Sequence, residues 1–437
     1  MITVPGDKSI SHRALLLSAL ARGESRLSGL LPGADCRSTA SVLRALGASV
    51  PPLPPDGSEI RVTGVGPEGL RSPAERLDCG NSGTTARLLL GLLAGLPVEA
   101  TLTGDESLRS RPMRRVTEPL GEMGAQFSEV GEPDRLPLIV KGGGLSSFSY
   151  RSTVASAQVK SALLLAGVTA RVPVEIEEPG RSRDHSERML RRMGCEVEEG
   201  GGPEEWRVRL TACPSTLDPL ELHVPGDFSS AAFFLALGLL GGAGSRLRIA
   251  NVGLNPTRTG LLDVFREMGG RIEVENLREA EDPSGEPAAD LVAFPSELHG
   301  VTVAGDVIPR LIDEIPILGV VAARASGVTE VRDAEELRVK ESDRIRVLAE
   351  NLAGLGGDVE ELPDGFRVKG PTGPLRGRIA VHHDHRIAMA FGVLGALPGH
   401  EVVVDDPAVA DVSFPGFWTL LEACAGGAPT PGANQAP

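Results

Sequence analysis

The chain has 437 residues, of which 41% are hydrophobic and only 3% are aromatic, and its formal net charge at pH 7 is −15. This length favours two domains of about 200 residues each. The acidic balance and the shortage of aromatic stacking residues argue against a nucleic-acid-binding protein, and the longest apolar stretch, residues 231–240, is too short to span a membrane.

The first predicted element is a helix that follows the turn Val-Pro-Gly-Asp at residues 4–7. Lys8, Ser9 and Arg13 lie at its start, where cations, hydroxyls and free backbone N–H groups suit phosphate or carboxylate binding. The same turn recurs at residues 224–227, but the helix predicted after it begins without a cation. The repeat indicates a duplicated fold, and the asymmetry indicates that only the first copy binds an anion. A solvated helix cap is the alternative interpretation of that copy.

A helix that ends in Leu-Gly or Met-Gly just before an apolar strand recurs along the chain. Glycine tolerates the left-handed backbone that often ends a helix, so the pattern predicts five C-terminal caps, at Gly47, Gly124, Gly194, Gly269 and Gly356. A final apolar run from residue 417, closed by two glycines at 426–427, resembles a sixth and degenerate copy. Six mixed α/β units of about 70–85 residues would therefore fill the chain.

Each of these five helices also has an arginine about three helical turns before its glycine, namely Arg37, Arg111, Arg183, Arg258 and Arg344. Free N–H groups and the positive end of the helix dipole add to each cation. If these helix starts face one cleft, that cleft attracts anions despite the net negative charge. The alternative is that arginines are common here and that some fall at this spacing by chance.

Two segments of the first half carry further anion-binding chemistry. Residues 80–85, Gly-Asn-Ser-Gly-Thr-Thr, precede a helix predicted from Ala86 to Leu96. Glycines let the backbone approach an anion closely, and the hydroxyls can cap the helix or contact the anion; a structural turn is the alternative. Residues 109–115 hold four arginines at the start of another predicted helix, more than one cap requires.

In the second half, Asp313 follows an apolar run and is a candidate base. Lys340, Glu341 and Arg344 open another predicted helix, where their spacing allows either a structural salt bridge or a carboxylate that carries a proton. Residues 382–385, His-His-Asp-His, suggest a metal site at first, but no paired carboxylates accompany them. We therefore expect no metal.

Seven of these stretches together resemble the EPSP synthase (3-phosphoshikimate 1-carboxyvinyltransferase) family of enolpyruvyl transferases. They are PGDKSISHRALL, GNSGTTARL, LTGDESLRSRPM, SRDHSERM, IDEIPIL, LRVKESDRI and DHRIAMA, and they follow the family's order over nearly the whole chain. The combination is highly specific, although no single motif is.

The resemblance implies an α/β fold of the α+β type with two globular domains, each of three repeated βαβαββ units, whose helix N-termini face an interdomain cleft. We expect one domain to combine residues 1–8 with 225–425 and the other to comprise residues 9–224, because in this family the chain crosses between the domains twice. Residues 426–437, rich in Gly, Pro and Ala, are expected to form a disordered tail.

The resemblance also implies an activity, the transfer of the enolpyruvyl (carboxyvinyl) group of phosphoenolpyruvate to the 5-hydroxyl of shikimate 3-phosphate, with release of phosphate. This is a step of the shikimate pathway of aromatic amino-acid biosynthesis. No cofactor is implied, and the expected partners are these two small molecules, with no nucleic acid and no membrane. The five scattered cysteines and the absence of a signal-peptide pattern favour a cytoplasmic protein, which we expect to be a monomer.

Site residues are carried over from the family position by position. Shikimate 3-phosphate would contact Lys8, Ser9, Arg13, Ser156, Gln158, Ser182, Asp313 and Lys340. Phosphoenolpyruvate would contact Lys8, Asn81, Gly83, Arg111, Gln158, Arg344 and Arg386.

The resemblance gives three of these positions a catalytic role. Asp313 would accept the proton of the 5-hydroxyl, Glu341 would carry the proton at the methylene carbon, and Lys8 would contact both substrates. Because Gly83 leaves little room at the phosphoenolpyruvate phosphate, we also expect inhibition by glyphosate, which competes with phosphoenolpyruvate in this family.

The chain departs from the family pattern at three positions. Ala157 stands where many relatives have a second serine, Glu336 replaces an asparagine, and Val412 stands where some relatives have a lysine. Each departure puts one substrate contact in doubt.

Two alternatives remain open from the sequence. The sister enzyme that transfers enolpyruvyl to UDP-N-acetylglucosamine resembles this family in fold, but it would show a cysteine before its Arg-Pro pair, and residues 104–110 contain none. A non-catalytic anion-binding module would leave Asp313 and Glu341 without a role.

Overall fold

The computed structural model describes residues 1–202, 205–242, 244, 246–279 and 285–425. The expected tail at 426–437 lies outside this range. The chain divides into two compact units. Unit 1 comprises Met1–Pro5, Pro225–Glu279 and residues 287–437, and unit 2 comprises Gly6–Val224 with residues 280–286. The first break thus follows Pro5, whereas we expected it after residue 8, and the domain assignment from the sequence stays a prediction.

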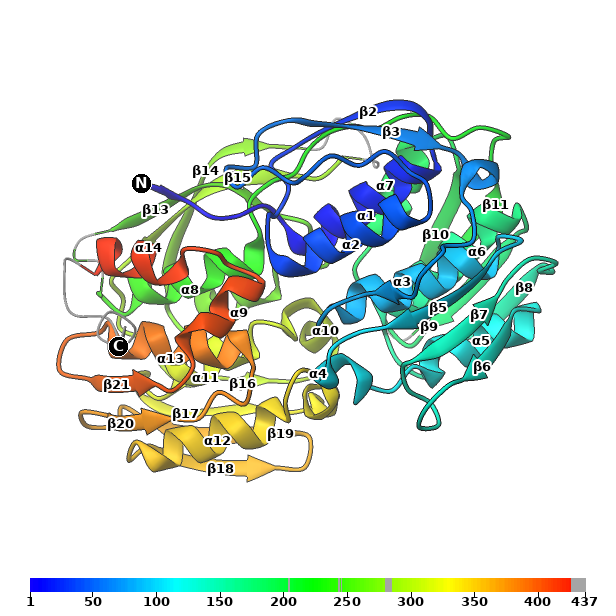
Figure 1. Cartoon of the computed structure of the whole chain (residues 1–437). Coiled ribbons are helices and arrows are strands. Elements are labelled where there is room, and N and C mark those ends of the chain that lie inside the picture. Colours follow the sequence, from blue (N-terminus) through cyan, green and yellow to red (C-terminus); the bar gives the residue numbers. More distant parts are fainter. Residues whose placement is uncertain (203–204, 243, 245, 280–284, 426–437) are drawn as a thin grey trace, which may run out of the picture. The chain divides into compact units, whose positions relative to one another are not determined.

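Unit 2 alternates strands and helices along the chain (Figure 1). Its helices are α1 (Lys8–Leu20), α2 (Ala34–Ala45), α3 (Gly83–Ala94), α4 (Glu106–Arg109), α5 (Arg114–Met123), α6 (Ala157–Ala170), α7 (His185–Arg192) and the 3-10 helix η1 (Pro67–Gly69). Its strands are β2 (Arg22–Ser28), β3 (Ile60–Val65), β4 (Leu77–Asp78), β5 (Glu99–Thr103), β6 (Gln126–Glu129), β7 (Leu138–Lys141), β8 (Phe148–Arg151), β9 (Val174–Glu178), β10 (Glu196–Gly202), β11 (Glu205–Ala212) and β12 (Glu221–His223).

Unit 1 has the same alternation. Its helices are α8 (Phe228–Leu239), α9 (Gly260–Glu267), α10 (Ile308–Leu311), α11 (Ile315–Ala322), α12 (Arg344–Gly354), α13 (His385–Gly395) and α14 (Phe417–Cys424), with the 3-10 helices η2 (Gly305–Val307), η3 (Glu335–Val339) and η4 (Pro407–Val412). Its strands are β1 (Ile2–Thr3), β13 (Leu247–Gly253), β14 (Arg271–Arg278), β15 (Ala288–Phe294), β16 (Thr302–Val303), β17 (Gly327–Val331), β18 (Asp358–Leu362), β19 (Gly365–Gly370), β20 (Arg376–Ile379) and β21 (Glu401–Val404).

The predicted βαβαββ repeat is confirmed in the sheets. In unit 2 the sheet orders are β12-β2-β3, β4-β5-β7-β6 and β10-β11-β9-β8, and in unit 1 they are β1-β13-β15-β14, β16-β17-β19-β18 and β20-β21. Each four-stranded sheet joins one parallel pair to an antiparallel hairpin, as with β4, β5 and the hairpin β6–β7. Only two strands form the last sheet in the described part of the chain, which agrees with a degenerate sixth copy.

The repeated Val-Pro-Gly-Asp turn marks an exchange of strands. Strand β1 precedes α1 in sequence but pairs in parallel with β13, which follows α8, and β12 precedes α8 but pairs in parallel with β2, which follows α1. Two of the breaks between the units fall inside this turn, after Pro5 and after Val224. Asp7 and Asp227 have the same local role, because their carboxylates accept the N–H groups of Ile10 and Ser230 and cap α1 and α8.

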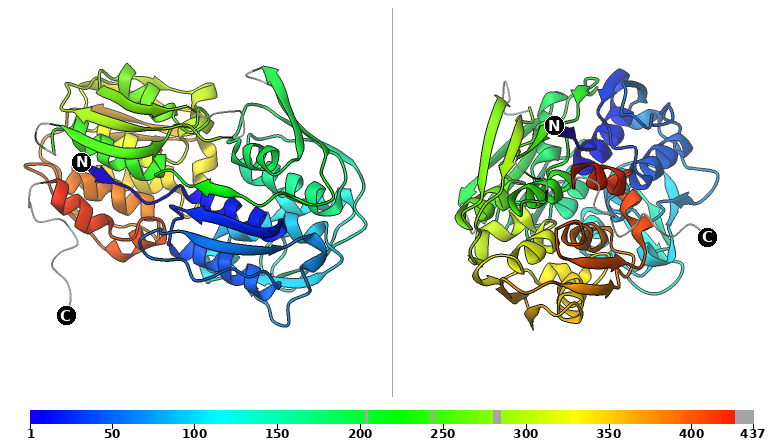
Figure 2. Two further views of the ribbon diagram at one scale, coloured as in Figure 1. Left: turned by 90° about the horizontal axis from the view of Figure 1, so that it is seen from above. Right: turned by 90° about the vertical axis from the view of Figure 1, so that its left-hand side faces the viewer.

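Each unit has its own hydrophobic core, which is aliphatic in unit 2 and includes buried phenylalanines such as Phe234 and Phe417 in unit 1. Helices α3 and α6 are rich in apolar residues and are buried along nearly their whole length. They pack closely, since a Cβ at Gly91 of α3 would lie 2.1 Å from the carbonyl oxygen of Ala162 in α6. In unit 1, α8 packs against β13 and β15, and the views in Figure 2 show the strands of this sheet (green) with the helices of the unit on one side of them.

The predicted C-terminal caps are confirmed at all five glycines. Gly47, Gly124, Gly194, Gly269 and Gly356 have φ of +104°, +122°, +90°, +92° and +94°, and they follow α2, α5, α7, α9 and α12. None of the helices within the described residues has the length and apolar character that a membrane span requires.

Candidate active site

The start of α1 places three predicted site residues in unit 2. Arg13 is 3% exposed, and its guanidinium donates to the hydroxyls of Ser186 (2.8 Å) and Ser161 (2.7 Å) and to the carbonyl oxygen of Ser9 (3.0 Å). These contacts tie α1 to α6 and α7. Lys8 forms an ion pair with Asp35, a buried carboxylate in the first turn of α2. Asp35 was missed from the sequence, although an acidic residue at a helix start was visible there.

Residues 80–85 lie at the start of α3, but the helix begins at Gly83 and not at Ala86 as predicted, so only residues 80–82 precede it. The Ser82 hydroxyl accepts the N–H of Thr85 (3.1 Å) and caps the helix. Arg111 is 8% exposed and donates to the Asn81 side-chain carbonyl at 2.6 Å. Gly83 opens the helix beside the same guanidinium, since a Cβ at this position would lie 3.4 Å from Arg111 Nη1. The structure therefore brings together the three residues predicted to hold the phosphoenolpyruvate phosphate.

Arg87 joins this loop to Gln158. Its Nη1 donates to Gln158 Oε1 at 2.9 Å and its Nη2 donates to the Pro112 carbonyl at 3.1 Å, while Gln158 Nε2 donates to Thr84 Oγ1 at 3.1 Å. Arg87 was also missed, but a cation four residues after Gly83 stands on the same helix face, and that spacing was a usable signal.

Ser156 and Ser182 lie on either side of one buried carboxylate. Glu178, at the end of β9, accepts the backbone N–H of Ser156 (3.0 Å) and the hydroxyl of Ser182 (2.8 Å). Lys160, in the first turn of α6, forms an ion pair with the same carboxylate at 3.0 Å. Glu178 and Lys160 were not predicted, although a single lysine within an apolar helix signals a buried counter-ion.

The remaining candidates form a cluster in unit 1. Arg344, 1% exposed, lies 3.4 Å from Asp313 Oδ1, 2.5 Å from Glu341 Oε2 and 2.8 Å from Asp384 Oδ2. Arg386 donates to the backbone carbonyl of Asp313 at 3.0 Å and lies 3.6 Å from its Oδ2. Burial alone would lower the pKa of Arg344, but the charges of Asp384, Glu341 and Asp313 outweigh it and raise that pKa, so this cation is permanent.

Lys340 differs from its predicted surroundings. Helix α12 begins only at Arg344, so residues 340–343 precede the helix. Lys340 directly follows η3, and its Nζ donates to Oε1 of Glu336 in that 3-10 helix at 2.8 Å. The i,i+3 pair of Glu341 and Arg344 is confirmed. Glu336, one of the departures from the family pattern, therefore contacts Lys340, a residue that is predicted to bind shikimate 3-phosphate. The other two departures from the family pattern are Val412, which lies in η4, and Ala157. The backbone carbonyl of Ala157 accepts a 3.5 Å hydrogen bond from Arg13.

The predicted arginines lie within three residues of the starts of their helices. Arg111, Arg258 and Arg344 are buried and Arg183 is half-buried, whereas Arg37 is exposed. In the histidine-rich stretch, Asp384 caps α13 and pairs with Arg344. Among the described residues no group of His, Cys, Asp and Glu is arranged to hold a metal ion.

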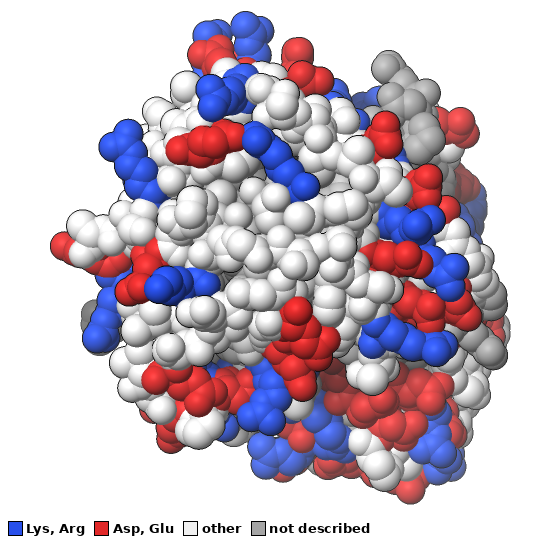
Figure 3. All heavy atoms as spheres, turned by 90° about the vertical axis from the view of Figure 1, so that its right-hand side faces the viewer, with Lys and Arg blue, Asp and Glu red and all other residues white. Residues whose placement is uncertain are grey.

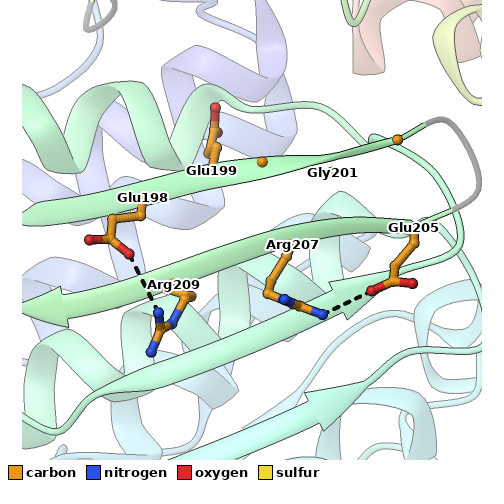
Figure 4. Close-up of a pocket in the computed structure, with 8 residues that line it drawn as sticks. Glu198, Glu199, Gly201, Glu205, Arg207 and Arg209 are labelled. Atoms are coloured by element: carbon orange, nitrogen blue, oxygen red, sulfur yellow. Dashed lines mark hydrogen bonds and ion pairs between the residues drawn. The ribbon is translucent and has the colours of Figure 1, made fainter.

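A pocket on unit 2 lies apart from these residues. It is lined by the β10–β11 hairpin, where Glu198 pairs with Arg209 (3.6 Å) and Glu205 with Arg207 (2.8 Å), as Figure 4 shows. Its arginines are already paired with glutamates, so it is a poor anion site, and none of the predicted site residues lines it. Figure 3 shows basic and acidic side chains next to one another along the lower right of one face, whose centre is mostly uncharged.

A family model described as EPSP synthase (3-phosphoshikimate 1-carboxyvinyltransferase) matches residues 1–421. Among relatives, the chain is 51% identical over 421 residues to the 3-phosphoshikimate 1-carboxyvinyltransferase of Gloeobacter violaceus, covering 96% of this chain and 95% of the relative. It is 48% identical over 423 residues to that of Geobacillus kaustophilus, with 96% of both chains covered.

Solved structures agree with these relatives. The structure is similar to that of EPSP synthase from Acinetobacter baumannii, with a TM-score of 0.81, 39% identity, and coverage of 97% of this chain and 95% of that one. It is also similar to the enolpyruvyl transferase NikO from Streptomyces tendae, with a TM-score of 0.75 and coverage of 97% and 94%, but at 18% identity this likeness shows the fold alone.

Proposed function

The chain belongs to the EPSP synthase family, and we infer that it carries out the family's reaction on two small molecules. It transfers the enolpyruvyl group of phosphoenolpyruvate to the 5-hydroxyl of shikimate 3-phosphate, giving 5-enolpyruvylshikimate 3-phosphate and phosphate. The protein is thus a transferase of aromatic amino-acid biosynthesis. The match to the family over residues 1–421 carries this conclusion.

We propose that unit 2 holds the two phosphate groups. Arg13, Ser156 and Ser182 take the 3-phosphate of shikimate 3-phosphate, with Ser9 and Gln158 beside it. Arg111, Asn81 and Gly83 take the phosphate of phosphoenolpyruvate, and Lys8 contacts both substrates. Buried guanidiniums and helix N-termini are strong donors to phosphate oxygens because little water competes with them, and the contacts of Arg111 with Asn81 and of Arg13 with α6 support the two groupings.

Arg344 and Arg386 bind the carboxylate of phosphoenolpyruvate in this proposal, and Lys340 lies beside the shikimate oxygens. Both arginines already contact Asp313, at 3.4 and 3.6 Å. A bound carboxylate would therefore lie next to the group that we assign as the base. The predicted interdomain cleft would bring these residues of unit 1 to those of unit 2, and it remains part of the proposal.

The proposed chemistry follows from the charges. Glu341 delivers a proton to the methylene carbon of phosphoenolpyruvate, which makes the adjacent carbon cationic. The 5-hydroxyl oxygen then bonds to that carbon while its proton passes to Asp313. The carbon–oxygen bond to phosphate breaks with both electrons on the phosphate, and a proton returns from the methyl group to the Glu341 carboxylate, which restores the double bond. Cations fixed around the leaving phosphate stabilise its charge as it forms.

We further propose that the protein acts as a monomer in the cytoplasm and uses no metal or other cofactor. Sedimentation at working concentration tests the first point, and unchanged turnover after treatment with a chelator tests the last.

Release of phosphate from phosphoenolpyruvate tests the reaction itself. We expect release with shikimate 3-phosphate as acceptor and none with UDP-N-acetylglucosamine. Release with the UDP-sugar alone would show that the chain has the sister activity. Release with neither acceptor would favour the alternative of a non-catalytic anion-binding protein.

A further inference from the structure

A buried lysine connects two of the proposed shikimate-phosphate ligands in unit 2. Lys160 lies in the first turn of α6 and is 0% exposed. Its Nζ lies 3.0 Å from Glu178 Oε2 and 2.8 Å from Glu187 Oε1, and it donates to the Ser182 carbonyl oxygen at 3.3 Å. The ammonium group therefore lies within 3.3 Å of three oxygen atoms, two of which belong to carboxylates.

Glu178 transmits this contact to the serines. Its side chain is 1% exposed. The Ser156 N–H donates to Glu178 Oε1 at 3.0 Å, and the Ser182 hydroxyl lies 2.9 and 2.8 Å from Oε1 and Oε2. One carboxylate therefore sets the separation of the two serines, and Lys160 holds that carboxylate in place.

The charge of Lys160 makes this arrangement possible. A buried carboxylate without a cation is costly. Burial alone would lower the pKa of Lys160, but the charges of Glu178 and Glu187 outweigh it and raise that pKa, so the ammonium stays charged. Burial raises the pKa of the Glu187 carboxyl.

The Ser182 hydroxyl can donate its hydrogen either to Glu178 or to a bound phosphate, but not to both. It carries one hydrogen, which it donates to Glu178 in this structure. A phosphate dianion only accepts, so Ser182 must turn this hydrogen away from Glu178 when the 3-phosphate binds. Two anions would then face one hydroxyl, and their repulsion is tolerable only while Lys160 neutralises Glu178.

We propose that Lys160 is a positioning residue for shikimate 3-phosphate, which fixes Ser156 and Ser182 through Glu178 and frees the Ser182 hydroxyl to bind the phosphate. This inference rests on the proposed function. Lys160 touches neither the reacting atoms nor the residues proposed for phosphoenolpyruvate, so its effect falls on one substrate.

Steady-state kinetics of Lys160→Met test the proposal, because methionine keeps the length of the side chain without its charge. We expect KM for shikimate 3-phosphate to rise about tenfold or more, since a buried anion is left unpaired beside the phosphate. KM for phosphoenolpyruvate and kcat at saturation should change less than about threefold. Lys141→Met, at an exposed lysine of β7, is the matched control and should behave as wild type.

The double variant Lys160→Met/Glu178→Gln separates positioning from mere stability. The glutamine amide can accept the Ser156 N–H and donate to the Ser182 oxygen. We therefore expect KM for shikimate 3-phosphate in the double variant to fall back close to the wild-type value. If Lys160→Met does not fold, the double variant is compared with wild type and should keep KM for phosphoenolpyruvate. An equal rise of both KM values, or no recovery in the double variant, overturns the proposal. Wild type that is inactive with shikimate 3-phosphate would instead refute the proposed function and, with it, this role.

Discussion

Asp313 lies between two arginines that belong to distant parts of unit 1. Arg344 Nη1 is 3.4 Å from its Oδ1, and Arg386 Nη2 is 3.6 Å from its Oδ2. Asp313→Asn keeps the shape and removes the proton acceptor, so we expect kcat to fall by about 10²–10⁴ while both KM values change only a few-fold. Steady-state kinetics measure this. Asp306→Asn, at an exposed carboxylate of η2, is the control, and unchanged kcat in Asp313→Asn would refute its role as the base.

Gly83 is a position where one added methyl group should change inhibition by glyphosate. A Cβ there would lie 2.9 Å from Arg87 Nη1 and 3.4 Å from Arg111 Nη1, so Gly83→Ala must shift at least the end of Arg87. Because that guanidinium holds Gln158, we expect weaker inhibition by glyphosate, with the inhibition constant raised about tenfold or more. Gly121→Ala in α5, where a Cβ meets nothing within 4 Å, should leave inhibition unchanged. Equal inhibition constants for wild type and Gly83→Ala would contradict the steric argument.

At the scale of elements, the helix ends show how local chemistry repeats. The glycine after each of α2, α5, α7, α9 and α12 has a positive φ, which L-residues with a side chain adopt at a cost. The helix starts are less uniform. Asp7 and Asp227 cap α1 and α8 in the same way, but only α1 carries Lys8 and Arg13. The turn and the cap are therefore repeated, whereas the cations that we propose as anion ligands occur only in the first copy.

The end of α12 offers a matched pair of glycines. Gly356 has a φ of +94° and Gly354 has none in that region, and a Cβ at either position meets nothing within 4 Å. We expect Gly356→Ala to lower the free energy of unfolding by about 1 kcal/mol through backbone strain alone. Gly354→Ala should be neutral or stabilising by up to about 1 kcal/mol. Urea titration with matched m-values measures both, and equal effects would show that strain is not the cause.

At the scale of the whole molecule, a chain of net charge −15 binds two anions. We propose that it does so through local, buried cations such as Arg13, Arg111 and Arg344. Short-range contacts in a site with little water outweigh the screened repulsion of distant surface carboxylates. In unit 2 the cations Lys8 and Arg13 lie close to the buried imidazole of His12.

The stability of unit 2 should therefore depend on pH through His12. Burial, with the charges of Lys8 and Arg13, lowers its pKa well below the ordinary value of 6.5. Above pH 6.5 His12 is neutral in both states, so its contribution is fully present. As the pH falls below 6.5 the unfolded chain binds a proton that the folded protein does not, and stability is lost by up to about 1.4 kcal/mol per pH unit.

Urea unfolding at pH 7.5, 6.5 and 5.5 measures this dependence. His12→Gln should flatten the loss of stability below pH 6.5, whereas His299→Gln, at an exposed histidine, should leave it as in wild type. The same slope in wild type and His12→Gln would show that other groups cause the pH dependence.

Features that depend on neighbours along the chain could be predicted before the structure was known. Caps such as Gly356, the basic helix start at Lys8 and the family motifs over residues 1–421 were all visible, because backbone conformation and capping depend on a few adjacent residues. The pair of Glu341 and Arg344 was predicted for the same reason.

The groups that contact the proposed site residues became visible only in the folded chain. Asp35 pairs with Lys8, Arg87 with Gln158, and Glu178 with both Ser156 and Lys160, across separations that the packing of α1, α3, α6 and β9 closes. Lys340 likewise pairs with Glu336 because α12 begins four residues later than the spacing suggested. Such partners depend on which helices and strands become neighbours, and strands β1 and β12 are exchanged between units in a way that local physics does not specify.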